Sequence, residues 1–191
     1  MKKTNVFSYG LFLFVALSVT DSKLPKGWIK AGDVPSKYDM YVDKQIAEDG
    51  KNCATIKSIY DEINGFGTLM QDCKPGKYRG KRIHMSGYVK SKDVKEWAGL
   101  WVRVDGRYTT LSFDNMQDRG ISGTTDWKKY DVILDVPKAA TNIAFGALLS
   151  GTGQIWFDNI AFEIVPDSTK TTSSFVQREY NDEPTNLNFE E

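Results

Sequence analysis

The chain has 191 residues, of which 40% are hydrophobic and 26% are charged. This length and composition are typical of one globular domain and leave too little chain for two domains of ordinary size. The 25 Lys and Arg residues balance 25 Asp and Glu residues, so no positive field would gather phosphates, and we expect no nucleic-acid partner.

The first 22 residues have the three parts of an export signal. Lys2 and Lys3 come first, an apolar run over 6–19 follows, and a short polar segment precedes Pro25. The run is shorter than the about 20 residues that a membrane-spanning helix needs, although an uncleaved anchor is the alternative. We therefore expect a signal peptide over 1–22 and an exported, periplasmic or extracellular protein. Membrane contact is expected only through this segment, if it stays uncleaved.

Strand-like runs follow the signal one after another, with turn-forming residues between them and no segment of helical period. The predicted strands are GWIKA (27–31), YDMYVD (38–43), CATIKSI (53–59), FGTLMQDC (66–73), KRIHMSGYVKS (81–91), WAGLWVRVD (97–105), TTLSFD (109–114), KKYDVILDV (128–136), NIAFGALLS (142–150) and GQIWFDNIAFEIV (153–165). So many strands favour an all-β, two-sheet antiparallel β-sandwich, because one open sheet would leave an apolar face uncovered.

The two cysteines flank a predicted hairpin formed by 53–59 and 66–73. If its turn centres near Ile63, Cys53 and Cys73 face each other with Cα atoms about 4.5 to 5.5 Å apart, which a disulfide accepts. An oxidising compartment would allow this bond to form. Two buried free thiols are the alternative, because a register slip of one residue puts the cysteines on opposite faces.

In KRIHMSGYVKS, alternation sends Ile83, Met85 and Val89 to the core and leaves His84 and Tyr88 on the outer face. His84 is the one histidine of the chain, and its place within a strand favours a surface residue over a member of a catalytic triad. Paired cysteines and one imidazole supply too few ligands for a zinc site.

The most informative strand is WAGLWVRVDG, at 97–106, because alternation gives its two faces different chemistry. One face is aliphatic and suits a core, with Ala98, Leu100, Val102 and Val104. The other face combines two indoles with a guanidinium and a carboxylate, from Trp97, Trp101, Arg103 and Asp105. Such a surface is typical of platforms that hold sugar rings or other flat ligands. The alternative is a second buried layer in which both tryptophans are covered and Arg103 pairs with Asp105.

The loop after this region, FDNMQDRGISGTTDW, contains several donors and acceptors, among them Asp114, Asn115, Asp118 and Arg119. These side chains either contact a ligand or form a hydrogen-bond network that fixes the loop, and the network is the favoured interpretation. Arg119 would then pair with Asp114 or Asp118 and make a site beside Trp101 rigid.

A pair of carboxylates is the enzymatic alternative. Glu96, Asp105, Asp114 and Asp118 lie close in sequence, and a glycosidase needs two carboxyl groups about 5 to 9.5 Å apart. Asp105 precedes a glycine in a turn, where aspartate is favoured for its backbone hydrogen bonds. A structural role of these residues is therefore favoured over catalysis.

Asp43 and Asp158 come from the first and last strands of the predicted sandwich and are candidates for a structural calcium site. Capping of backbone amides by the same side chains is the alternative. No other cofactor is expected. Residues 166–185 form a polar linker by composition, and Leu187 and Phe189 alternate with polar residues, which predicts an edge strand over 186–190.

A series of motifs along the chain resembles a bacterial jelly-roll domain of the galactose-binding-like type. The motifs are GW followed by AGDVPSKYDMYVD, then FGTLMQ, YRGKRIHMSGYV, WAGLWVRVDG, FDNMQDRGISGTTDWKKYDVILDVP and GTGQIWFDNIAFE. Such domains stand beside AraC-type transcriptional regulators and in stand-alone exported proteins. The resemblance covers about 26–165 and is strongest over 97–136. It implies a ligand-binding fold and, because the sequence carries no basic helix-turn-helix, does not imply DNA binding. The closing strand, with Trp156 and Asp158, is also similar to that of carbohydrate-binding modules.

We therefore expect an exported, non-catalytic β-sandwich that binds carbohydrate or another small ligand by stacking on an aromatic face. The candidate ligand-binding residues are His84, Tyr88, Trp101, Arg103, Asp105, Asp114 and Arg119. A carboxylate-dependent glycoside hydrolase or lyase is one alternative. The other is a structural or protein-interaction domain whose outer face is covered by the 166–191 tail or by a second copy of the chain.

Overall fold

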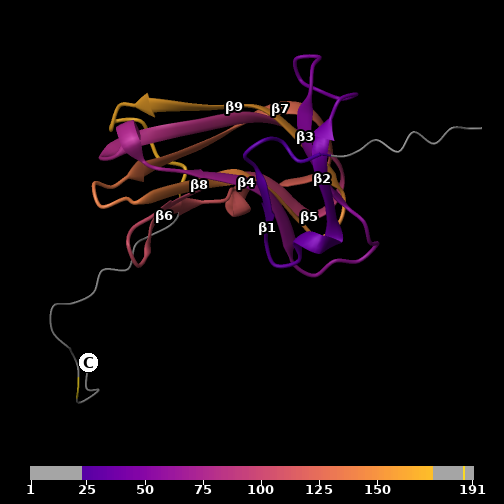
Figure 1. Cartoon of the computed structure of the whole chain (residues 1–191), viewed down its shortest axis with the longest axis horizontal. Coiled ribbons are helices and arrows are strands. Elements are labelled where there is room, and N and C mark those ends of the chain that lie inside the picture. The colour runs from indigo at the N-terminus through magenta and orange to yellow at the C-terminus, as the bar shows by residue number, and fades with distance from the viewer. Residues whose placement is uncertain (1–22, 174–186, 188–191) are drawn as a thin grey trace, which may run out of the picture.

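A computed structural model of the chain describes residues 23–173 and Leu187 (Figure 1). The predicted signal peptide over 1–22 lies outside the described residues, and so does the predicted edge strand over 186–190 apart from Leu187. Within the described part of the chain, no helix is long and apolar enough to cross a membrane.

The described chain forms nine β-strands joined by turns and three short 3-10 helices. The strands are β1 (Ile29–Ala31), β2 (Tyr38–Asp43), β3 (Cys53–Ser58), β4 (Phe66–Cys73), β5 (Lys81–Asp105), β6 (Thr110–Asp114), β7 (Ile121–Val136), β8 (Asn142–Ser150) and β9 (Gln154–Val165). The 3-10 helices are η1 (Pro35–Lys37), η2 (Gly76–Tyr78) and η3 (Gln117–Arg119). Every strand pair is antiparallel, so the prediction of an all-β antiparallel sandwich is confirmed.

Strand β5 is shared by the two layers of the sandwich (Figure 1). Its first half pairs with β7 and β9, and β9 continues through β3 to β2, which gives sheet I. Its second half pairs with β6 and β8, and β8 continues through β4 to β1, which gives sheet II. The runs at 81–91 and 97–105, predicted as separate strands, are therefore two halves of one strand.

The inner faces of the two halves of β5 meet in one hydrophobic core. The core includes Ile83, Met85 and Val89 from the first half and Leu100, Val102 and Val104 from the second. Because these inner faces oppose each other, the outer faces of the two halves point in opposite directions. The predicted grouping of His84 and Tyr88 with Trp101 and Arg103 on one face is therefore wrong. Alternation is correct within each half, but the strand changes sheets between them.

The predicted hairpin between 53–59 and 66–73 is also wrong. Strand β3 lies in sheet I, with Cys53 opposite Asp43, whereas β4 lies in sheet II, with Cys73 opposite Ile143. Cys53 and Cys73 are consequently free thiols, the first buried and the second exposed. The Cys53 thiol donates to the carbonyl of Ile46 at 2.8 Å, and burial raises its pKa to about 12.

Tyr38 ties the start of β2 in sheet I to the connections that flank β4 and β8 in sheet II. Its side chain is 2% exposed, and its hydroxyl lies 2.8 Å from the carbonyl oxygen of Gly151 and 3.2 Å from that of Gly65. Gly67 makes room for the ring, since a Cβ there would lie 2.4 Å from Tyr38 Cδ2. Burial raises the pKa of the Tyr38 phenol to about 12.

Replacing Tyr38 by Phe is expected to lower the free energy of unfolding at pH 7 by about 1 to 3 kcal/mol, because the buried carbonyl of Gly151 loses the hydroxyl proton that it shares with the carbonyl of Gly65. Urea denaturation measures this loss, with the exposed Tyr60→Phe as control. The folded chain keeps the Tyr38 proton between pH 10 and 12 while the unfolded chain releases it. The stability that Tyr38 contributes is thus complete below pH 10 and is lost as the pH rises through 12. The difference in free energy of unfolding between the parent and Tyr38→Phe should therefore become smaller over this pH range. A loss equal to that of Tyr60→Phe would contradict this role.

Candidate functional site

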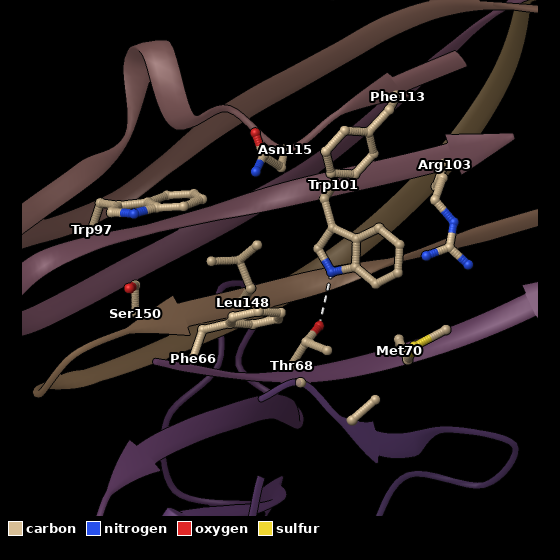
Figure 2. A pocket seen from close by; sticks show the side chains of 12 residues that line it. Phe66, Thr68, Met70, Trp97, Trp101, Arg103, Phe113, Asn115, Leu148 and Ser150 are labelled. Carbon is tan, nitrogen blue, oxygen red and sulfur yellow. Dashed lines mark hydrogen bonds between the residues drawn. The ribbon is translucent and has the colours of Figure 1, made fainter. Parts of the chain in front are cut away.

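A cavity of about 240 Å³ opens on the outer face of sheet II (Figure 2). Four aromatic side chains line it, from Phe66, Trp97, Trp101 and Phe113. Met70 and Leu148 add aliphatic surface, and Thr68, Arg103, Asn115 and Ser150 supply polar atoms. This combination of apolar walls with a few polar groups is typical of sites that bind small molecules.

Alternation along the strands brings the lining side chains of this cavity to one face of sheet II. Phe66, Thr68 and Met70 alternate along β4, so their side chains share the outer face of sheet II. On β8, Gly146 lies opposite Met70 on one side and Trp101 on the other. A Cβ at Gly146 would lie 2.3 Å from the carbonyl oxygen of Leu69, so the glycine lets β8 and β4 approach each other closely beside the cavity.

Trp101 is a fixed wall of the cavity. Its side chain is 6% exposed, and its indole nitrogen donates to the hydroxyl of Thr68 at 2.8 Å (Figure 2). The Thr68 hydroxyl in turn donates to the carbonyl of Ala147 at 2.7 Å. The polar atom of the indole is therefore satisfied within the fold. Trp97 is only half-buried, so it is the more accessible of the two predicted indoles.

The loop after β6 closes one side of the cavity. Gly99 stands between the two tryptophans on β5, and a Cβ there would lie 2.9 Å from the carbonyl oxygen of Asn115. The missing side chain lets Asn115 approach the strand and line the cavity. Met116, which follows it, has a left-handed backbone with φ of 62° and is buried. Such a conformation is unusual for a residue other than glycine and needs support from its surroundings.

Asp114 supplies that support. Its side chain is 4% exposed, and its carboxylate accepts hydrogen bonds from the Met116 amide at 2.9 Å and the Arg119 guanidinium at 2.8 Å. Arg119 also pairs with Asp118 at 2.9 Å. These contacts form the hydrogen-bond network that the sequence favoured, and Asp114 and Arg119 do not line the cavity.

The first residues of the predicted linker extend this network. Thr172 donates from its hydroxyl to Asp114 and from its amide to the carbonyl of Ile133 on β7. Ser173 donates to the carbonyl of Phe113 on β6. Residues 166–173 therefore contact the edges of both sheets. None of the residues in this described segment lines the cavity.

The remaining predicted ligand-binding residues lie in two places. On sheet I, His84 Nε2 is 2.6 Å from a carboxylate oxygen of Asp131, and Tyr88 is half-buried. On sheet II, Arg103 lines the cavity, and Asp105 pairs with it without lining the cavity itself.

The carboxylates near the cavity accept hydrogen bonds from neighbouring side chains. Glu96 accepts from the Ser150 hydroxyl at 2.5 Å, Asp105 accepts from Arg103, and Asp114 belongs to the loop network. None of the residues that line the described cavity carries a carboxylate. The cavity therefore lacks the pair of facing carboxyl groups that glycoside hydrolysis uses.

Asp43 and Asp158 cap backbone amides. This capping role is the alternative to a calcium site that the sequence left open. Asp43 accepts from the amides of Gln45 and Ile46 and from the indole of Trp156. Asp158 accepts from the amides of Glu48 and Asn159. Among the described residues, no three His, Cys, Asp or Glu side chains gather closely enough to hold a metal ion.

No protein-family model matches the sequence. The chain is 42% identical over 171 residues to the uncharacterized HTH-type transcriptional regulator YbfP of Bacillus subtilis (strain 168). This similarity covers 88% of the chain and 58% of YbfP. The chain thus spans a little over half of the length of this curated relative.

Several solved structures share the fold. The CBM22-1 xylan-binding domain from Paenibacillus barcinonensis Xyn10C has a TM-score of 0.56 and 16% identity, over 74% of this chain and 88% of that domain. A cyclase from Fischerella sp. TAU has a TM-score of 0.57 and 15% identity, over 81% of this chain and 94% of the cyclase. At such identities the similarity shows the β-sandwich fold, which agrees with the predicted architecture.

Replacing Asp114 by Asn is expected to lower the free energy of unfolding by about 2 kcal/mol, because the buried hydrogen bonds to a charged acceptor are weakened. Asp118→Asn is the matched control, since Asp118 pairs with the same Arg119 but is 56% exposed, and should cost less than about 1 kcal/mol. Chemical denaturation of both variants measures the difference. Equal losses would show that the buried carboxylate does not hold the loop.

Proposed function

We propose that this protein is a non-catalytic binding domain that holds a carbohydrate in the cavity of sheet II. The aromatic lining of that cavity carries the proposal. Sugar rings have apolar C–H faces that pack against aromatic rings and hydroxyl edges that form hydrogen bonds. Both kinds of partner are present in the cavity.

Trp97 is the main stacking residue in this proposal. Its ring points from one end of the cavity towards Trp101, with Leu148 between them (Figure 2). Because Trp97 is half-buried and Trp101 is nearly covered, a ligand would gain more new contact with Trp97. Trp101 would contribute a pre-positioned apolar wall.

Polar groups stand at both ends of the cavity. Asn115 and Ser150 lie near Trp97, and Arg103 lies beyond Trp101 (Figure 2). A ligand that stacks along the cavity would therefore place hydroxyl groups against polar side chains at either end. A purely apolar ligand would remove water from the free Nη1 group of Arg103 and from the Ser150 hydroxyl oxygen without replacing its hydrogen bonds, which is unfavourable.

Two comparisons support the proposal. The Paenibacillus domain that shares this fold is a xylan-binding domain. YbfP is named a transcriptional regulator, and a binding domain beside such a regulator would sense a ligand. Export of the present chain stays a prediction that rests on the residues before the described fold.

Replacing Trp97 by Ala is expected to weaken binding to a retained glycan by about 5- to 30-fold, because loss of an aromatic contact removes roughly 1 to 2 kcal/mol. A glycan array identifies the glycan, and calorimetry on the purified variant measures its affinity.

Trp127→Ala and His84→Ala are the controls, since both residues belong to sheet I, and both should bind like the parent. Full binding by Trp97→Ala would show that this cavity is not the site. Release of shorter sugars from the bound glycan would contradict a non-catalytic role.

A further inference from the structure

At each end of the cavity, a polar side chain that lines it forms a hydrogen bond to a carboxylate. At one end, Arg103 donates from Nε to one oxygen of Asp105 at 2.8 Å and from Nη2 to the other at 3.1 Å. At the opposite end, the Ser150 hydroxyl donates to Glu96 at 2.5 Å. Arg103 and Ser150 line the cavity, whereas Asp105 and Glu96 do not.

Asp105 is itself held in place from two neighbouring strands. The hydroxyl of Thr110 lies 3.5 Å from one of its oxygens, and the side-chain amide of Asn142 lies 3.5 Å from the other. Thr110 belongs to β6 and Asn142 to β8, which flank this half of β5. Pairing with both strands fixes the backbone of Asp105, and its carboxylate orients the Arg103 guanidinium through two hydrogen bonds.

This arrangement limits what Arg103 can offer to a ligand. An arginine binds a carboxylate best through two parallel hydrogen bonds and an uncompensated charge. Here one such face of the guanidinium is taken by Asp105, and the positive charge is balanced by the same residue. A sugar hydroxyl needs neither a pair of parallel hydrogen bonds nor an uncompensated charge. It can accept one hydrogen bond from Nη1 of Arg103, for which no partner is present among the described residues.

Ser150 imposes a second condition. Its single hydroxyl proton points to Glu96, so towards the cavity Ser150 can only accept a hydrogen bond. A sugar hydroxyl can donate that bond, whereas an ionised carboxylate has no proton to donate. Together, Arg103, Asp105 and Glu96 carry a negative net charge, which repels an anionic ligand.

We propose that the Arg103–Asp105 pair makes the cavity selective for neutral sugars over sugar acids, with Asp105 as the specificity-determining residue. This inference rests on the proposed carbohydrate-binding function. Asp105 acts through Arg103: it balances the charge and occupies one hydrogen-bonding face, so that the guanidinium serves as a donor to a hydroxyl.

The test compares matched oligosaccharides that differ only at C6, with a hexose in one member and the corresponding hexuronate in the other. Glucose, galactose and mannose pairs are used as probes, and calorimetry gives both affinities for each protein. Asp105→Asn preserves the shape of the side chain and removes its charge. Asp135→Asn is the matched control, because Asp135 holds Arg82 on sheet I through the same two-point geometry, at 2.7 and 2.9 Å.

The parent protein is expected to bind the neutral member of a pair at least about tenfold more tightly, and Asp105→Asn to reduce or reverse that ratio by about tenfold, since a charge-assisted hydrogen bond becomes available. Added salt should weaken hexuronate binding by this variant, because that binding is electrostatic. Asp135→Asn should keep the ratio of the parent. Thermal unfolding verifies that both variants are folded.

Equal affinity of the parent for both members, or an unchanged ratio in a folded Asp105→Asn, would overturn the selectivity while leaving carbohydrate binding in place. Failure of the parent to bind any neutral or acidic probe, or any glycan of the array, would overturn the proposed function and this inference with it.

Discussion

The passage of β5 through both sheets is the constraint on which the rest of the structure depends. The strand pairs with β7 and β9 in its first half and with β6 and β8 in its second. Because one continuous backbone belongs to both layers, the core residues of its halves are fixed opposite each other. The backbone positions of the outer residues of the second half, including Trp97 and Arg103, are then fixed relative to that core. The cavity is therefore built on a strand that cannot shift without disturbing both sheets.

The period of two in the sequence predicted which face of each strand would be buried, because alternation is a local property of the backbone. Leu100 and Val102 are buried in the core and Arg103 lies on the opposite face, as predicted. The choice of partner strand is not local. A hairpin and a crossover between sheets have the same alternation, so the spacing of Cys53 and Cys73 could not distinguish them. The same ambiguity placed His84 beside Trp101, although they lie on opposite sides of the sandwich.

Part of the cavity was recognisable in the sequence, and part of it was not. Trp101 and Arg103 were identified because they stand out on an otherwise aliphatic strand. Phe66 and Met70 were missed, although their spacing in FGTLMQ places both on one face of β4. Leu148 gave no signal, since residues 143–149 of β8 are buried on both faces and alternation cannot then identify the outer one. The glycines that shape the cavity become meaningful only when the neighbouring backbone is known.

The cavity combines fixed and adjustable parts in a way that bears on how it would distinguish ligands. Trp101 is held by Thr68, and the Asn115 loop is held by the buried carboxylate of Asp114. A ligand that contacts these groups has little conformational entropy to remove, which favours affinity through pre-organisation. Trp97 and Arg103 keep more exposure, but Asp105 restrains the guanidinium. In the proposed site, Trp97 then provides accessible aromatic surface for a sugar ring, whereas Arg103 and Ser150, each bonded to a carboxylate, select the charge and hydrogen-bonding pattern of the ligand.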